Sequence, residues 1–84
     1  MDSWYVYMLR CADSTLYTGI TTDLERRLAE HNENNLLGAR YTRARRPVSL
    51  VYHELCENRS AASKRESKIK NMSKPAKELL IVEQ

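Results

Sequence analysis

The residues that suggest chemistry in this chain are an acid on a basic helix and, upstream, an arginine and a histidine one helical turn apart. Helical spacing places Glu66 on the same stripe as Ala62 and Ile69, so the acid points roughly inward. A buried carboxylate is costly unless a cation or a metal ion balances it. Arg27 and His31 lie together on a second helical segment. An acid, an arginine, a histidine and several tyrosines that converge on a small sheet would suit phosphodiester chemistry.

Two short apolar segments near the N-terminus are the first elements that must position these residues. Residues 4–9 are aromatic, branched or apolar at odd and even positions alike, which predicts a strand covered on both faces. A turn at 12–15 and a second strand at 16–20 complete a hairpin. Gly19 near the end of that strand permits unusual backbone angles or the close approach of a ligand.

A capping box marks the first helix. The Thr22 hydroxyl and the Glu25 side chain have the spacing of this motif, which predicts a helix that runs to about residue 32. Residues 39–46 predict a loop or short helix that carries four arginines, and Pro47 ends it.

The remaining elements are a strand and two helices. Residues 48–55 predict the third strand, Asn58 or Ser60 can cap the helix that bears Glu66, and Ser73 can cap the final helix. The order is therefore β-β-α-α-β-α-α. This order predicts an α+β fold in which helices pack on one small antiparallel sheet.

Composition indicates one soluble globular domain over residues 1–84, because 42% of the residues are hydrophobic and 30% are charged. No apolar run is long enough to span a membrane, and the first residues lack a signal-peptide pattern. We therefore expect a cytoplasmic protein. Cys11 and Cys56 show no metal-type spacing and are predicted to be buried, reduced thiols.

The charge is modest in sum, at +3, but uneven along the chain. Four arginines fall within residues 40–46 without an acid among them, and six cations fall within residues 64–77. Such asymmetry suggests a polyanionic partner. A solvated basic surface that serves solubility is the ordinary alternative for charge runs.

Taken together, the motifs resemble the GIY-YIG nuclease superfamily, and more closely its small stand-alone bacterial members. The two tyrosine motifs read Tyr5-Val6-Tyr7 and Tyr17-Thr18-Gly19, and residues 38–47 resemble a segment typical of the stand-alone members. The resemblance extends from residue 3 to about residue 82. It places the arginine of the family on Arg27, its histidine on His31 and its metal-binding glutamate on Glu66.

The resemblance implies an α/β sandwich with a three-stranded antiparallel sheet, in agreement with the order above. It also implies cleavage of DNA with one divalent metal, Mg²⁺ or Mn²⁺. Two departures stand out. Tyr5 replaces the first glycine of the family motif, and the family's C-terminal asparagine has no clear match. We therefore expect either slow catalysis or the use of another polar residue such as Lys77.

Each implied catalytic residue has an ordinary structural alternative. Glu66 as a metal ligand competes with an ion pair to Lys70, and Arg27 as a phosphate clamp competes with a pair to Glu30 or Glu33. Tyr7 and Tyr17 are the candidates for water activation. A phenol needs a neighbouring cation, metal or imidazole to lower its pKa, and His31 can serve. The alternatives are core aromatics for both tyrosines, and for His31 a charge that complements a helix C-terminus.

The arginine-rich segment is the predicted nucleic-acid contact, because arginines there would bind backbone phosphates without reading sequence. Two of its members, Tyr41 and Thr42, either line the same site or anchor the segment. The predicted contact residues are Arg40, Tyr41, Thr42, Arg43, Arg45 and Arg46.

These residues predict a metal-dependent endonuclease that hydrolyses DNA phosphodiester bonds, directed by DNA structure and acting in repair or processing. The main alternative is a nucleic-acid-binding module that keeps the fold with little or no catalysis. A weaker one is a structural partner of a larger repair complex. RNA stays open as a substrate, because a phosphate clamp and a metal do not discriminate the sugar.

Overall fold

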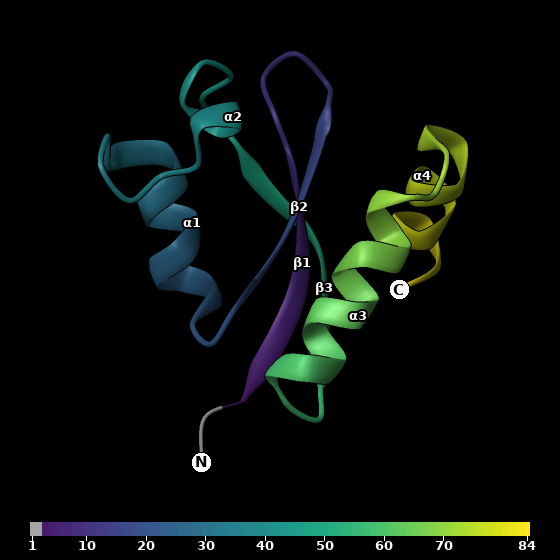
Figure 1. The fold of residues 1–84 in the computed structure, drawn as a ribbon. Coiled ribbons are helices and arrows are strands. Elements are labelled where there is room, and N and C mark those ends of the chain that lie inside the picture. The colour runs from purple at the N-terminus through teal and green to yellow at the C-terminus, as the bar shows by residue number, and fades with distance from the viewer. Residues whose placement is uncertain (1–2) are drawn as a thin grey trace.

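The computed structural model, which describes residues 3–84, has the expected order of strands and helices (Figure 1). It confirms a three-stranded antiparallel sheet with helices packed on it. Within the described residues the elements are β1 (Trp4–Arg10), β2 (Leu16–Thr21), α1 (Leu24–Glu33), α2 (Arg40–Arg43), β3 (Ser49–Cys56), α3 (Arg59–Lys70) and α4 (Lys74–Glu83).

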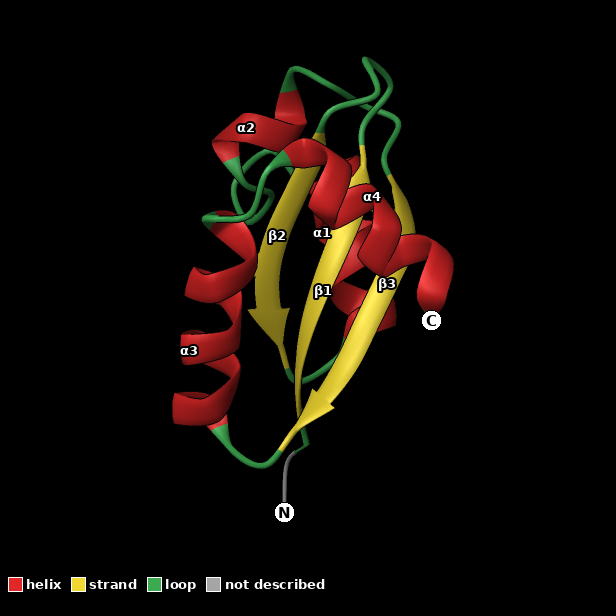
Figure 2. Ribbon diagram, turned by 90° about the vertical axis from the view of Figure 1, so that its right-hand side faces the viewer, coloured by secondary structure: helices red, strands yellow, loops and turns green. Residues whose placement is uncertain are grey.

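The strand β1 lies at the centre of the sheet, between β2 and β3, as Figure 2 shows. Its sequence suits this place because both of its faces are apolar. Tyr7 and Leu9 are buried on one face, and Val6 and Met8 are buried on the other. Each face thus has a core of its own, which explains why this strand reads as apolar at every position.

The helices form a layer on each side of the sheet (Figure 1). On the Tyr7 face, Leu24 and Leu28 of α1 pack against the sheet. On the opposite face, Ile69 of α3 belongs to the core, and α4 packs beside it through Leu80 and Ile81. The helix α3 lies against both β1 and β2.

The caps of three helices show how the chain sets their starts. The first helix begins at Leu24, so its N-cap is Asp23 and not Thr22, and the predicted capping box is wrong. The Asp23 carboxylate accepts a hydrogen bond from the Arg26 backbone N–H at 3.0 Å. Asn58 caps α3, and Ser73 caps α4 as predicted.

Polar links between distant segments fix the layers. Arg10 of β1 donates two hydrogen bonds to the Glu78 carboxylate of α4, at 2.8 and 2.5 Å. The Asn32 side chain both donates to the Val48 carbonyl and accepts from the Val48 N–H, at 2.9 and 2.7 Å. The end of α1 is thereby tied to the chain just before β3.

Two simpler expectations concern the thiols and the membrane. Cys11 is buried and Cys56 is partly buried, and both are free. Among residues 3–84, no helix combines the length and the apolarity that a membrane crossing needs.

We expect Gly19→Ala to destabilise the fold, because a Cβ at this position would lie 2.5 Å from the Tyr7 hydroxyl oxygen across the β1–β2 pair. Tyr7 is buried and has little room to move, so the free energy of unfolding should fall by about 1–3 kcal/mol. Urea denaturation measures this. In a Tyr7→Leu background the cost should largely disappear, and an undiminished cost there would contradict the assigned contact.

Candidate active site

Tyr7 is the residue around which the candidate site is built. It lies in the middle of β1, directly opposite Gly19 of β2, and only 2% of its surface is exposed. Because Gly19 has no Cβ, the tyrosine ring passes over its backbone and turns its hydroxyl toward α1. The close approach expected at this glycine is therefore made by Tyr7.

A chain of hydrogen bonds runs from Tyr7 through α1 to α2. The Tyr7 hydroxyl lies 2.8 Å from His31 Nε2, and His31 Nδ1 lies 2.8 Å from the Thr42 hydroxyl. The Thr42 hydroxyl donates in turn to the Ala39 carbonyl at 2.9 Å. Three residues that are distant in sequence are thus connected inside the protein.

Burial determines the protonation states of Tyr7 and His31 in this chain of hydrogen bonds. It raises the pKa of Tyr7 to about 12, against the lowering effect of the Arg27 guanidinium beside its hydroxyl. Burial also lowers the pKa of His31 to about 4, and the positive charge of Arg27 adds to this effect. At neutral pH, Tyr7 is protonated and His31 is uncharged, so His31 carries no charge with which to complement the helix dipole.

Arg27 lies between the buried chain of hydrogen bonds and the protein surface. Its Nη1 donates to Glu30 at 3.0 Å, which is the ion pair considered as its structural alternative. The same atom donates to the Leu37 carbonyl at 2.6 Å. Its guanidinium also lies beside the Tyr7 hydroxyl and favours the ionised form of that group. Arg27 therefore has structural partners and a place in the site.

Tyr17 completes an aromatic cluster with its neighbours. Its ring centre lies 5.1 Å from that of His31, 6.5 Å from that of Tyr7 and 6.0 Å from that of Tyr41. The ring is partly buried. The structure therefore brings both predicted tyrosines and the histidine together.

Glu66 reaches the site from α3, on the other side of the sheet from α1. Its side chain is 22% exposed and lies 3.4 Å from Lys70, the ion pair considered as its alternative. The negative charge of Glu66 also contributes to the raised pKa of Tyr7, after burial and the charge on Tyr17. The acid is thus partly buried, as its helical stripe predicted, and electrostatically coupled to the tyrosine.

The donor set at Glu66 restricts the kind of metal ion that would fit. Within residues 3–84, no three His, Cys, Asp or Glu side chains are grouped as they would be around a fully protein-bound ion. One carboxylate whose remaining ligands are water and phosphate suits Mg²⁺ or Mn²⁺ and not a zinc-type site. The residues present therefore fit an ion that is held mainly by its hydration shell and the substrate.

The arginine-rich segment is largely occupied with internal contacts. Arg46 donates to the His31 and Asn34 carbonyls and to the Asn35 side chain, at 2.7, 3.1 and 2.9 Å. Arg45 pairs with Asp13 at 3.0 Å and lies over the Tyr41 ring. These contacts fix the segment against α1 and the β1–β2 turn.

The other members of the segment differ in exposure. Thr42 is 0% exposed, so the structure brings it to His31 and not to the surface where a nucleic acid would bind. Arg43 donates to the Asn35 carbonyl at 2.7 Å while remaining exposed. Arg40 and Tyr41 are exposed as well.

Two contributions to the site were absent from the sequence analysis. One is the steric role of Gly19 toward Tyr7, which depends on the register of β1 and β2. The other is Arg46, whose side chain satisfies carbonyls at the C-terminal end of α1. A basic residue after a helix is a general signal for such a contact, but 15 residues separate Arg46 from His31.

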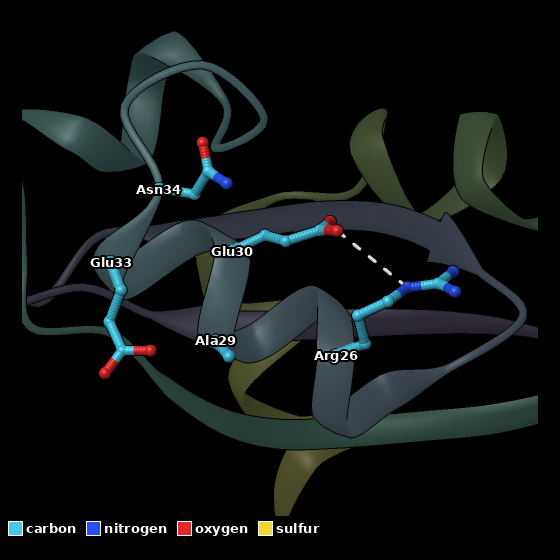
Figure 3. Close-up of a pocket in the computed structure, with 5 residues that line it drawn as sticks. All are labelled: Arg26, Ala29, Glu30, Glu33 and Asn34. Carbon is cyan, nitrogen blue, oxygen red and sulfur yellow. Dashed lines mark ion pairs between the residues drawn. The ribbon is translucent and has the colours of Figure 1, made fainter.

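A shallow hollow of about 250 Å³ lies elsewhere, on the outer side of α1. Figure 3 shows its side chains, among which Arg26 and Glu30 form an ion pair at 3.8 Å. None of the predicted catalytic residues lines it. The lining residues are Arg26, Ala29, Glu30, Glu33 and Asn34.

The chain is similar to known proteins over most of its length. The model of the GIY-YIG catalytic domain matches residues 3–79. A UPF0213 protein of Desulfotalea psychrophila is 58% identical over 79 residues, which are 94% of this chain and 71% of that protein. A UPF0213 protein of Natronomonas pharaonis is 52% identical over 80 residues, which are 95% and 92% of the two chains. The solution NMR structure of a UPF0213 protein from Bacillus halodurans superposes with a TM-score of 0.62 at 38% identity. The match covers 98% of this chain and 85% of that chain.

We expect the buried neutral His31 to make stability depend on pH. The pKa of His31 is about 4 in the fold and 6.5 when unperturbed, so its contribution is complete above about pH 6.5 and is lost as the pH falls toward 4. The loss should be roughly 3 kcal/mol of the free energy of unfolding. Denaturation of the protein and of His31→Gln at several pH values measures it. The control His53→Gln, at an exposed site, should keep the wild-type dependence of the free energy of unfolding on pH. The same dependence in His31→Gln would refute the assignment of this loss to His31.

Proposed function

Because this chain belongs to the GIY-YIG catalytic domain family, a family of nucleases, we propose that it is an endonuclease that hydrolyses DNA phosphodiester bonds with a divalent metal ion. The observation that carries the proposal is the convergence of Tyr7, Tyr17, His31 and Arg27 around one hydroxyl group. Glu66 influences the pKa of the same hydroxyl from the opposite layer. Tyrosine with imidazole can supply a base, guanidinium can stabilise charge and carboxylate can hold a metal ion, which are functions that this hydrolysis needs.

Tyr7 and His31 supply the proton acceptor in the proposed reaction. The attacking water gives a proton to the Tyr7 oxygen, and the Tyr7 proton moves to His31 Nε2, 2.8 Å away. The hydroxide formed attacks phosphorus, the bond to the leaving oxygen breaks, and that oxygen takes a proton from solvent. The raised pKa of Tyr7 makes a stable phenolate unfavourable at rest. The transfer to His31 is therefore coupled to the attack.

Arg27 stabilises negative charge in this scheme. A guanidinium has five N–H donors, and the contacts to Glu30 and Leu37 use one nitrogen, Nη1. The remaining donors can bind phosphate oxygens as charge develops in the pentavalent transition state. Tyr17, beside His31, is placed to hold the water or the phosphate by hydrogen bonding.

Glu66 is the proposed ligand of the metal ion, Mg²⁺ or Mn²⁺. The bound ion would supply Lewis-acid stabilisation of the phosphate charge. Glu66 would exchange its ion pair with Lys70 for that ion. Because one carboxylate holds the ion weakly, we expect metal binding to depend strongly on the presence of nucleic acid.

Exposed leucines beside the phosphate clamp support a substrate with an opened base step, such as a branch, flap or nick. Leu36 is 93% exposed, and its loop is held by side-chain hydrogen bonds. The Asn34 side chain accepts from the Leu36 and Leu37 N–H groups at 2.8 Å, and the Leu37 carbonyl accepts from Arg27. Apolar side chains that project in this way can insert between bases. We propose that such structure-directed cutting serves DNA repair or processing.

Partners and location extend the proposal. Exposed Arg40 and Arg43 would contact nucleic-acid phosphates, and RNA is an alternative to DNA. A repair protein is a further candidate partner. The free thiols suit the reducing cytoplasm, and residues 1–84 are proposed to act as one domain.

A nucleic-acid-binding module without catalysis is the second candidate. It is favoured by the distance between the pKa values of Tyr7, about 12, and His31, about 4, which makes this pair a weak base at rest. It is favoured also by Tyr5 in place of the first glycine of the family motif.

Substitution of the metal ligand tests the enzyme. We expect Glu66→Gln and Arg27→Ala each to lower the cleavage of labelled branched DNA in Mg²⁺ by at least about a hundredfold. The first substitution weakens the hold on the metal ion, and the second removes the guanidinium that stabilises the transition state. The control Glu57→Gln removes an exposed acid just before α3 and should cleave normally.

EDTA should abolish all cleavage, and circular dichroism should show that every variant is folded. Full activity in folded Glu66→Gln would contradict the metal assignment. Binding without any cleavage, on duplex, single-stranded, flapped and branched DNA alike, would favour the binding module.

A second substitution tests the substrate class. We expect Leu36→Ala to reduce kcat/KM for branched DNA at least about fivefold and to leave cleavage of plain duplex unchanged, because only the former offers an open step to an apolar wedge. The control Leu79→Ala removes an equally apolar, exposed side chain from α4. An equal response of both substrates to Leu36→Ala would refute the wedge.

A further inference from the structure

In the hydrogen bonds that join Tyr7, His31, Thr42 and the Ala39 carbonyl, each group acts as a donor or an acceptor. This assignment gives Thr42 a role. We propose that Thr42 is a positioning residue, which holds the imidazole of His31 in the tautomer with the proton on Nδ1 and leaves Nε2 free to accept the proton of Tyr7. The inference rests on the proposed nuclease function for its consequence in catalysis. The tautomer itself can be measured without any cleavage.

The donors and acceptors at Thr42 determine one end of the chain. A hydroxyl has a single proton, and that of Thr42 is directed to the Ala39 carbonyl at 2.9 Å. The Thr42 oxygen, 2.8 Å from His31 Nδ1, is then available only as an acceptor. His31 Nδ1 must therefore carry the ring proton, since the imidazole is neutral.

The groups around Tyr7, at the other end of the chain of hydrogen bonds, indicate the same tautomer of His31. The Arg27 guanidinium beside the Tyr7 hydroxyl has donors only. If His31 Nε2 also carried a proton, the Tyr7 oxygen would face two donors and its own proton would have no acceptor in this chain. With Nε2 unprotonated, Tyr7 donates to His31 at 2.8 Å, and its oxygen lone pairs remain free to face the Arg27 guanidinium.

Burial makes this arrangement obligatory in the fold. His31 and Thr42 are both 0% exposed, so water cannot replace a lost partner. A buried donor without an acceptor is costly, and loss of the Thr42 hydroxyl would leave Nδ1–H in that state. His31 would then rotate or move its proton to Nε2, where it would block the transfer from Tyr7.

The arginine-rich segment explains how a four-residue helix can hold Thr42 so firmly. Arg46 binds carbonyls at the end of α1, Arg45 pairs with Asp13 in the β1–β2 turn, and Arg43 binds the loop after α1. These contacts hold the buried side of α2 next to His31. The segment thus supports the proton acceptor in addition to any contact that its exposed residues make with phosphates.

Long-range ¹H–¹⁵N correlation spectra of the ¹⁵N-labelled protein at pH 7 report the tautomer directly. We expect His31 to show a protonated Nδ1 and an unprotonated Nε2, while exposed His53 serves as the internal reference. In Thr42→Val, which is nearly isosteric, the single His31 tautomer should be lost. Thr42→Ser, which keeps the hydroxyl, should restore it.

Kinetics tests the role in catalysis. We expect Thr42→Val to lower kcat for DNA cleavage at least about tenfold with little change in KM, because Thr42 does not reach the surface, and Thr42→Ser to recover most of the rate. A wild-type His31 protonated on Nε2, or an unchanged tautomer and rate in Thr42→Val, would overturn the inference.

The two proposals fail in different ways. The wild-type spectrum remains decisive even if Thr42→Val does not fold, because it needs no variant. The predicted tautomer in a wild-type protein that cleaves no nucleic acid would overturn the catalytic part of the role together with the nuclease, and would leave the orienting contact established. Cleavage that is insensitive to Thr42 would refute this inference and leave the nuclease intact.

Discussion

The hydrogen bond between Tyr7 and His31 is the constraint on which the rest of the structure depends. A tyrosine in the central strand must bury its ring, and its hydroxyl then needs a partner inside the protein. That partner comes from α1, and α1 can approach only because Gly19 leaves the space that the tyrosine ring fills. One polar contact thus relates the β1–β2 register to the position of a helix.

The two faces of the sheet also differ in the kinds of side chain that they bury. The Tyr7 face holds Tyr7, Tyr17 and the His31 imidazole, the groups to which the proposed reaction assigns proton transfer and contact with water or phosphate. The other face is a conventional apolar core, on which α3 carries a single carboxylate. Burial of Tyr7 and His31 in a low dielectric keeps both groups neutral at neutral pH.

Local signals in the sequence were sufficient for the fold, because each element carries its own. The two-sided apolarity of residues 4–9 identified the central strand, and Asn58 and Ser73 marked helix starts correctly. The start of α1 was misplaced by one residue because Thr22 and Asp23 are adjacent and both residue types are good caps. Glu66 was correctly expected to face inward, since helical periodicity gives orientation.

The site was less accessible to the same reasoning, because it depends on which side chains meet across the sheet. The family resemblance grouped Tyr7, Tyr17 and His31 as site residues, but the partners of their hydrogen bonds depend on the fold. The arginines of residues 40–46 looked alike in sequence. Their partners separate them into Arg46, which caps a helix, and Arg40, which is exposed. Charge alone does not show whether a cation is already satisfied.

The bidentate pair between Arg10 and Glu78 has a consequence for how the protein is made. It joins the central strand to the last helix across 68 positions of sequence, and β1 also needs β3, since Trp4 pairs with Cys56. Because β1 precedes the other elements of this domain, both of its edges and faces are covered only after β3, α3 and α4 have been synthesised. Folding that depends on such late contacts is slow relative to local helix formation. During synthesis, the apolar strand at residues 4–10 is the segment that a nascent-chain chaperone would need to shield.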